Sequence, residues 1–423
     1  MNPLVLAAIL FVATYVLLLA LSNYRHIVAL VGAASFVLVG ILPVGNLFGA
    51  IDWNVLLMIA GSMGLVQLFI DSGMPALMAN VMLRYTKTVR ITIVALALFA
   101  GIISAFIDNV ATVLMVAPIA LAVSRRVGIS PVPVVISVAV SSNLQGAATL
   151  VGDTTSILLG AAAGMDFMDF FWYNGKPGMF WVVQAGAVAS AVILYFLFRN
   201  TPGSVEPAED PVVENKVPTI LLLAMVALLA GASAIPNKPD ITNGLICCVL
   251  MVVGIVYETM RGNKEAVKSA VGAIDWQTLL LLAGVFIVVA GVEAAGVLEV
   301  ISGVFAGLGG GNLFIIYAAI VWGSVLCSAF IDNIPYTAAM LPVVENISSM
   351  LGINPTLLYF GLLCGATLGG NLTPVGASAN ITGIGILRKE GYEVKNSDFL
   401  KIGVPFTLSA VITGFAILWV LWA

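Results

Sequence analysis

The sequence predicts an all-α polytopic membrane protein made of two inverted repeats, each with five transmembrane spans, one of them broken, and one re-entrant hairpin. Of the 423 residues, 61% are hydrophobic and 9% are charged, whereas soluble domains carry about a quarter charged residues. Apolar stretches long enough to cross a hydrocarbon core of about 30 Å recur along the whole chain. The same ordered set of motifs also occurs twice.

The repeat is visible in the letters of the sequence. The stretch IDWNVLLMIAG from Ile51 returns as IDWQTLLLLAG from Ile274. The hexapeptide SAFIDN occurs at 104–109 and again at 328–333, and shorter matches continue in the same order. Such colinearity at a near-constant offset indicates two copies of one structural unit.

Each copy contains six elements in the same order. The first repeat covers 1–198, a polar, Pro-rich and acidic linker covers 199–216, and the second repeat covers 217–423. In the first repeat we predict spans at 3–22, 27–43, 54–70 and 179–198, a hairpin at 90–124 and a broken helix at 131–163. In the second repeat we predict spans at 217–234, 241–257, 276–293 and 403–422, a hairpin at 312–349 and a broken helix at 356–387.

The hairpins decide the topology. Each hairpin is too short for two full crossings with caps, so we expect its tip to stop inside the membrane. Each repeat then crosses the membrane five times, and this odd number inverts the second repeat. Of the 17 Lys and Arg residues, this topology places all but Lys176 and Lys238 on one side, Arg25 included. The positive-inside rule then predicts a cytoplasmic linker and both termini outside the plasma (inner) membrane. Residues 3–21 lack a basic segment and a cleavage site, so they form a retained span rather than a signal peptide.

Several classes of function are disfavoured. There is no phosphate-binding loop of the GxxxxGKS type, as an ATP-driven pump would need, and no basic run that suggests nucleic acid. Four cysteines lie in apolar segments without a metal-ligand or disulfide spacing, namely Cys247, Cys248, Cys327 and Cys364. We therefore expect a transporter of a small ion or solute in the lipid bilayer, not an enzyme, with no cofactor.

Two acids at the hairpin tips are the first candidates for a binding site. Asp108 and Asp332 occupy equivalent positions, followed by Asn109 and Asn333. A carboxylate inside the bilayer costs several kcal/mol unless it is paired, protonated or bound to an ion, so such residues usually have a function. The alternative is that each Asp caps the second helix of its hairpin. The two interpretations are compatible.

The broken helices supply the other candidates. Gly, Pro and small hydroxyl residues unwind a helix there and offer oxygens, as in transporters whose sites lie at discontinuous helices. The candidates are Asn143, Asp153, Thr154 and Thr155 in the first repeat, and Asn371, Thr373, Ser378 and Asn380 in the second. Asp153 has Ala377 as its counterpart, which suggests a coupling role, although capping of the following helix is an alternative. For Asp52 and Asp275, which each open a span, we favour helix capping.

These motifs resemble a known family. The paired AFIDN tips, the VGDTTS stretch and the segment LGGNLTPVGASANI are similar to the ArsB/NhaD group of the ion transporter superfamily, over nearly the whole chain. That superfamily includes citrate and dicarboxylate carriers, sodium/proton antiporters, arsenite and antimonite exporters and relatives of the P protein. The resemblance implies a homodimer in which a mobile domain, here 90–163 and 312–387, slides as an elevator against the remaining spans.

The departures from the family pattern favour a cation. In the carboxylate carriers the tips carry a neutral Ser-Asn-Thr motif, whereas here they carry Asp, and we find no Lys or Arg inside a predicted span to balance them. We therefore expect sodium/proton antiport, with sodium at Asp108, Asp332, Asn143 and Asn371 and with protons or sodium as the coupling ion. The alternatives are proton-coupled arsenite or antimonite efflux, citrate or dicarboxylate transport, and a non-transporting scaffold. For arsenite or antimonite efflux, we expect Cys327 and Cys364 to lie near the site.

Overall fold

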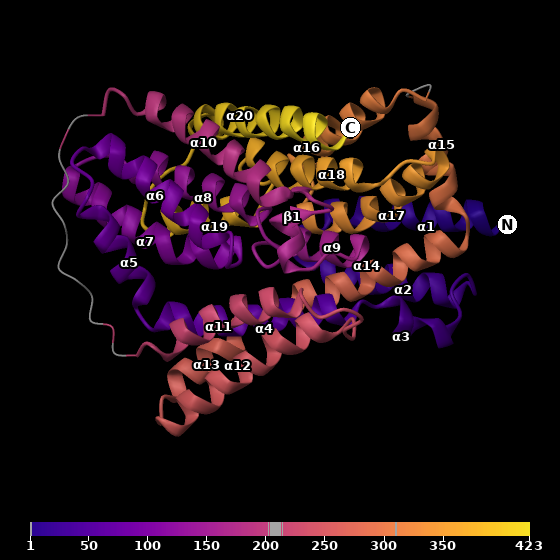
Figure 1. Cartoon of the computed structure of the whole chain (residues 1–423), viewed down its shortest axis with the longest axis horizontal. Coiled ribbons are helices and arrows are strands. Elements are labelled where there is room, and N and C mark those ends of the chain that lie inside the picture. Colours follow the sequence, from indigo (N-terminus) through magenta and orange to yellow (C-terminus); the bar gives the residue numbers. More distant parts are fainter. Residues whose placement is uncertain (1, 202, 204–212, 214, 309–310) are drawn as a thin grey trace.

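The computed structural model describes the whole chain except residues 1, 202, 204–212, 214 and 309–310. The predicted nearly all-helical architecture is confirmed (Figure 1). The helices of the first half are α1 (Pro3–Ala20), α2 (Arg25–Leu38), α3 (Leu47–Ala50), α4 (Trp53–Asp71), α5 (Met74–Leu83), α6 (Val89–Ser104), α7 (Asn109–Val127), α8 (Pro131–Gly146), α9 (Thr154–Ala163) and α10 (Met179–Leu197). Most of the predicted linker lies outside the described residues.

The second half follows with the same kinds of element. Its helices are α11 (Val217–Ala232), α12 (Thr242–Met260), α13 (Lys264–Gly272), α14 (Trp276–Ala294), α15 (Val297–Leu308), α16 (Leu313–Ser328), α17 (Asn333–Leu351), α18 (Thr356–Gly369), α19 (Ser378–Lys389) and α20 (Asn396–Trp422). A small antiparallel hairpin of β1 (Trp172–Tyr173) and β2 (Lys176–Pro177) precedes α10. Its turn has positive φ at Asn174 and Gly175, which suits a two-residue hairpin.

Seven helical stretches in the described chain are long and apolar enough to cross a membrane by length and composition: α1, α4, α7, α10, α12, α13 with α14, and α20. Helix α7 alone has 19 residues, or roughly 28 Å at 1.5 Å per residue. By length this arm alone could cross, whereas α6, with 16 residues, is among the shorter apolar helices. The re-entrant assignment now depends on where the tip lies, and the ten crossings and their inverted orientation stay predictions.

The helices pack in two groups. Helices α4 and α12 lie along each other, as do α2 and α14, and α1 and α11 pack against these pairs. The hairpin helices pack on the broken helices, with α6 and α7 against α8 and with α16 and α17 against α18. Figure 1 shows α4, α11, α12 and α13 together on one side, and α10, α16, α18 and α20 together on the other.

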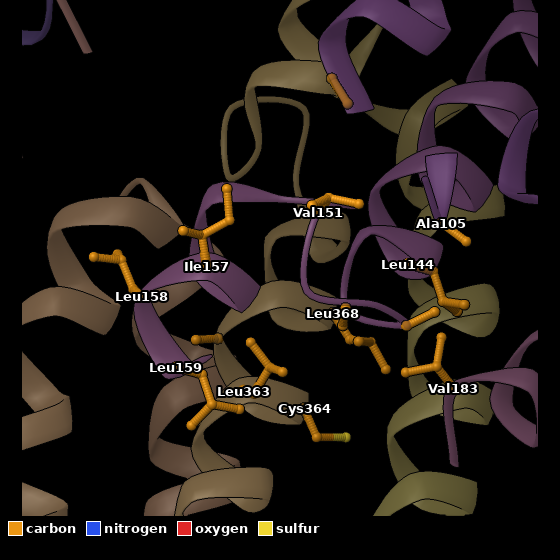
Figure 2. Close-up of a cluster of buried hydrophobic side chains, with 14 of the residues drawn as sticks. Ala105, Leu144, Val151, Ile157, Leu158, Leu159, Val183, Leu363, Cys364 and Leu368 are labelled. Atoms are coloured by element: carbon orange, nitrogen blue, oxygen red, sulfur yellow. The ribbon is translucent and has the colours of Figure 1, made fainter. Parts of the chain in front are cut away.

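The last helix of each half changes the predicted division into mobile and fixed parts. We assigned 179–198 and 403–422 to the scaffold, but α10 and α20 pack on each other, and α10 also contacts α6 and α8 while α20 contacts α8 and α18. Figure 2 shows Leu144 and Val151 beside one break in a buried apolar cluster with Val183 of α10 and Leu363 of α18. We therefore group α10 and α20 with the hairpins.

Three helices of nine or more residues were not anticipated from the sequence. Helix α5 has 10 residues and α15 has 12, so each falls below the length of a span, and each follows a glycine with positive φ, Gly73 or Gly296. Helix α13 precedes α14 with a mixed polar sequence. Helix α20 begins at Asn396 rather than at 403, because its first two turns are polar and a hydropathy window misses them.

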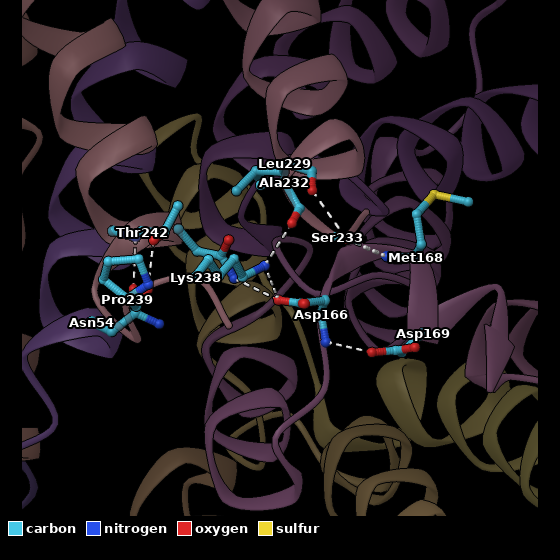
Figure 3. Close-up of polar contacts among 12 residues, drawn as sticks. Asn54, Asp166, Met168, Asp169, Leu229, Ala232, Ser233, Lys238, Pro239 and Thr242 are labelled. Atoms are coloured by element: carbon cyan, nitrogen blue, oxygen red, sulfur yellow. Dashed lines mark hydrogen bonds and ion pairs between the residues drawn. The ribbon is translucent and has the colours of Figure 1, made fainter. Parts of the chain in front are cut away.

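A polar contact joins the two groups of helices. Lys238, between α11 and α12, forms an ion pair with Asp166, which follows α9 (Figure 3). Asn243 Nδ2 donates to the same carboxylate at 3.3 Å, and Ser233 Oγ accepts from the backbone amide of Met168 at 3.2 Å. These contacts connect the segment after α9 to the turn between α11 and α12.

Candidate transport site

Both hairpin tips use an aspartate to begin the second helix. Asp108 Oδ2 accepts hydrogen bonds from the backbone amides of Val110 at 2.9 Å and Ala111 at 3.1 Å. Asp332 Oδ1 accepts from the amide of Ile334 at 3.1 Å. These bonds satisfy amides that have no partner within the helix. The capping interpretation is thus correct for α7 and α17, and it leaves carboxylate oxygens for other contacts.

The break in each broken helix docks on the neighbouring hairpin tip in the same way. Thr149 Oγ1 donates to the carbonyl oxygen of Ala105 in the first half, and Thr373 Oγ1 donates to that of Ala329 in the second. A Cβ at Gly152 would lie 2.7–2.9 Å from three carbonyl oxygens, so only glycine fits this approach. The tip of each hairpin therefore lies at the middle of a broken helix, which supports a position within the membrane.

An asparagine network joins the two halves behind the tips. Asn143 Nδ2 donates to the carbonyl oxygen of Thr367 at 2.8 Å and to Asn371 Oδ1 at 3.1 Å. Asn143 Oδ1 accepts from Asn109 Nδ2 at 3.0 Å, and Asn371 Nδ2 donates to the carbonyl oxygen of Val140 at 2.8 Å. The side chains of Asn143 and Asn371 are thus already occupied by each other and by the backbone, and they hold the two breaks together.

Asp153 connects the first break with the second hairpin. It precedes α9 without a side-chain capping bond, and its Oδ2 accepts from Thr155 Oγ1 at 3.0 Å and from Asn333 Nδ2 at 3.2 Å. Thr155 Oγ1 also lies 2.9 Å from Thr367 Oγ1. Asp153 is 4% exposed. The capping alternative for Asp153 therefore does not hold for its side chain, which instead joins elements from both halves.

These elements enclose a cavity of about 360 Å³. One wall is formed by the hairpin tips and the starts of α9 and α19, and the other by α4 and the start of α14. Three carboxylates line it, from Asp108, Asp153 and Asp275, and none of its lining residues is Lys, Arg or His. The polar lining residues are Gln67, Asp108, Asn109, Asp153, Thr154, Asp275, Thr278, Asn333, Ser378 and Thr382.

The structure brings together only part of the predicted site. Of the predicted residues, Asp108, Asn109, Asp153, Thr154, Asn333 and Ser378 line the cavity. The others do not line it: Asn143, Thr155, Asp332, Asn371, Thr373 and Asn380. Of the proposed sodium ligands Asp108, Asp332, Asn143 and Asn371, only Asp108 lines this cavity. Within the described residues, no group of three or more His, Cys, Asp and Glu side chains could hold a metal ion.

Asp332 has a partner that the sequence argument missed. Arg25 Nη1 donates to Asp332 Oδ2 at 2.8 Å. We found no basic residue to balance the tips, and this ion pair corrects that statement. The assignment of Arg25 to the cytoplasmic flank stays a prediction. No local pattern signals the contact, because the two residues are 307 positions apart.

Asp275 and Gln67 were also missed as cavity residues. Asp275 Oδ1 accepts from the amides of Gln277 at 3.0 Å and Thr278 at 3.1 Å, so the predicted cap is correct, and the residue also lines the cavity. The repeated IDW motif is the sequence signal that could have identified Asp275 as a cavity residue. Asp52 caps α4 through the amide of Val55 at 3.0 Å but does not line the cavity.

The cysteines give no support to a thiol site. Neither Cys327 nor Cys364 lines the cavity, which corrects the expectation that they lie near the site. Cys364 is buried in the apolar cluster of Figure 2, and Cys327 is exposed at the end of α16. Cys247 is buried between α12 and α4, where a Cβ added at Gly61 would lie 2.8 Å from its Cβ.

A second cavity, of about 460 Å³, lies where α4 and α12 end and α13 begins. Its buried acid Glu258 accepts hydrogen bonds from Asn215 Nδ2 and from Asn263 Nδ2, the latter at 3.0 Å. Arg261 Nη1 lies 3.7 Å from the same carboxylate. The charge of Glu258 is thus balanced locally, and neither hairpin tip reaches this cavity.

Comparisons with known proteins agree with a transporter. A family model described as "Citrate transporter" (CitMHS) matches residues 8–365. A protein of Mycobacterium tuberculosis (strain ATCC 25618 / H37Rv), described as an uncharacterized transporter, is 30% identical over 427 residues, which cover 98% of each chain. The P protein of Homo sapiens is 24% identical over 506 residues, which cover 98% of this chain and 59% of the P protein.

Two solved structures have a similar fold. The YdaH transporter of Alcanivorax borkumensis gives a TM-score of 0.65 at 16% identity and covers 99% of this chain and 98% of its own. MtrF of Neisseria gonorrhoeae, described with a class of antimetabolite efflux pumps, gives 0.58 at 16% identity and covers 100% of this chain and 95% of its own. At such identities the likeness concerns the fold alone.

The matched family and these relatives are transporters rather than enzymes. The resemblance to the ion transporter superfamily is thereby confirmed, with the P protein among the relatives. The chain is accordingly a multi-pass membrane transporter, and it belongs to the citrate transporter (CitMHS) family.

Proposed function

We propose that this transporter exchanges sodium ions for protons, and that both bind in the cavity between the hairpin tips. One observation carries the proposal: three carboxylates line the cavity, and no basic side chain does. A carboxylate in a membrane interior is stable only when it is protonated or paired with a cation. The wall therefore favours a cation or a proton over an anion.

Competition for the same carboxylates would couple the two fluxes. Asp108 and Asp153 are the acids that we place at the ion, and the oxygens of Asn109, Thr154 and Ser378 complete its surroundings. When sodium occupies the carboxylates, protons leave, and when protons bind, sodium leaves. Such a site needs no cofactor, and its coupling ion is the proton.

The cavity lies between the two groups of helices, which suits alternating access. Met63 and Gln67 of α4 and Thr278 of α14 line one side, and the hairpin tips line the other. We propose that the hairpins, the broken helices, α10 and α20 move together as an elevator against the remaining helices. The Asp166–Lys238 and Arg25–Asp332 ion pairs both join the two groups and would break during this movement. A homodimer, with both termini outside the plasma membrane and the linker in the cytoplasm, completes the proposal.

Citrate or dicarboxylate transport is the second candidate. The matched family model is described as a citrate transporter, and the first residues of α7, α9, α17 and α19 line the cavity. Helix N-termini attract anions, each with about half a unit charge. A carboxylate substrate would have to enter together with cations, because the wall itself is negative. Metalloid export is weaker, since neither Cys327 nor Cys364 lines the cavity.

Flux in proteoliposomes with an internal pH dye tests the proposal. Sodium, lithium, potassium, citrate and arsenite are added in turn, and protein-free liposomes serve as the control. We expect sodium or lithium to drive proton movement, and Asp153→Asn to remove it. A response to citrate or arsenite alone would contradict the antiport proposal and assign the cavity to that solute.

A further inference from the structure

An ion pair between Arg25 and Asp332 balances the charge of the second hairpin tip. Asp332 Oδ2 accepts from Arg25 Nη1 at 2.8 Å, while Oδ1 accepts from the amide of Ile334 at 3.1 Å. Arg25 Nε also donates to the carbonyl oxygen of Leu18 at 3.4 Å, which orients the guanidinium from the end of α1. The two side chains are 23% and 10% exposed. Asp332 is thus a balanced and largely enclosed charge.

The first tip differs although its sequence is the same. Both tips read SAFIDN, yet Asp108 uses one oxygen, Oδ2, for both backbone amides of its cap. Within the described residues no ion pair involves Asp108, and this residue lines the cavity, whereas Asp332 does not. The caps differ because Ala111 donates a backbone amide to Asp108, whereas its counterpart Pro335 has no amide hydrogen. The charge balance differs because Arg25 pairs with Asp332.

A second contact fixes the same tip to the same helices. Tyr15 Oη of α1 donates to the carbonyl oxygen of Pro335, in the first turn of α17, at 3.0 Å. Helices α1 and α2 belong to the group that packs along α14. Two side chains from α1 and α2 therefore hold the second hairpin, one by a charge and one by a hydrogen bond.

We propose that Arg25 is a tethered counter-ion, which takes at Asp332 the place that a transported cation takes at Asp108. Arg25 acts through Asp332 and is a positioning residue, and the ion is carried by the first tip with Asp153. This inference rests on the proposed function only in naming the transported cation as sodium; the role of Arg25 at Asp332 is argued independently. Its physical basis is that removing one partner of a buried ion pair leaves an uncompensated charge, whereas removing both is tolerated.

A double-mutant cycle tests the inference. Asp332→Asn keeps an oxygen that can cap α17, and Arg25→Gln keeps a long polar side chain, so each change removes mainly charge. Both variants, the double variant and Arg25→Lys are purified in detergent, melted and reconstituted for the proton-flux assay. Arg199→Gln, at an exposed position, is the matched control for loss of a positive charge.

We expect each neutral single variant to lower the melting temperature and the flux, the double variant to recover both, and Arg25→Lys to keep most of the flux. A double variant that is as stable as the wild type but has no flux would identify Asp332 as an ion ligand and overturn the proposal. Additive losses of stability, or none, would show that the pair is not coupled, with the same consequence.

The cycle remains decisive if sodium/proton exchange itself fails. In that case sodium drives no proton flux in the wild type. This result refutes the proposed function but leaves the tethered counter-ion proposal for Arg25 and Asp332 untouched. The same four proteins are then compared with whichever solute of the panel drives flux, and the melting cycle is unchanged. Recovery in the double variant again supports the tethered counter-ion, and its absence refutes it.

Discussion

Replacing Asp108 by Asn is expected to abolish sodium-driven proton flux while the protein still folds. The Asn oxygen can accept the two amide hydrogen bonds that Asp108 Oδ2 accepts now, at 2.9 and 3.1 Å, so the start of α7 is preserved. The negative charge, however, disappears from the cavity. Because a neutral amide neither takes up a proton nor balances a cation, the exchange loses its shared ligand.

The measurement is initial proton flux in proteoliposomes at matched protein density. Flux of Asp108→Asn should fall to the level of protein-free liposomes, while its gel-filtration profile stays that of the wild type. Asp240→Asn, which removes a carboxylate from an exposed loop position, should retain wild-type flux. Normal flux in Asp108→Asn would exclude this carboxylate from the ion path.

Replacing Asn143 by Ala is expected to have the largest effect on stability. This fully buried amide satisfies Asn109 Nδ2, the carbonyl oxygen of Thr367 and Asn371 Oδ1. Each buried polar group left without a partner costs about 1–3 kcal/mol. Since the three partners come from a hairpin, α18 and the second break, the loss should separate elements of both halves.

The expected result is a much lower melting temperature, or little monodisperse protein after extraction in detergent. Asn396→Ala is the matched control, because this residue lies exposed at the start of α20 and its truncation should leave the melting temperature unchanged. If Asn143→Ala melted like the wild type, the asparagine network would not be what joins the two breaks.

Local signals in the sequence predicted the parts of the site that local chemistry determines. Asp108, Asp275 and Asp332 cap helices because short acidic side chains satisfy the first amides of a helix. Gly152 lies at a break because the chain approaches three carbonyl oxygens there. The repeated SAFIDN motif correctly pointed to two tips whose cap geometry is similar.

Contacts between distant segments could not be predicted in this way. The repeat implies two equivalent tips, but Arg25 reaches only Asp332, and nothing in the spacing of either motif indicates that partner. Asp275 was interpreted as a cap alone, although it also lines the cavity together with the first hairpin tip. The packing of α10 and α20 on the broken helices was not predicted, because which helices share a buried face is a tertiary property. Which helices move stays a prediction.

Binding of radioactive sodium to the purified protein tests the central claim most directly, because it needs neither a membrane gradient nor a known direction of transport. We expect saturable binding to the wild type that falls as protons are added, that is lost in Asp108→Asn, and that persists in the Arg25→Gln, Asp332→Asn double variant. Absence of sodium binding to a well-folded wild type that citrate stabilises against heat would contradict the account.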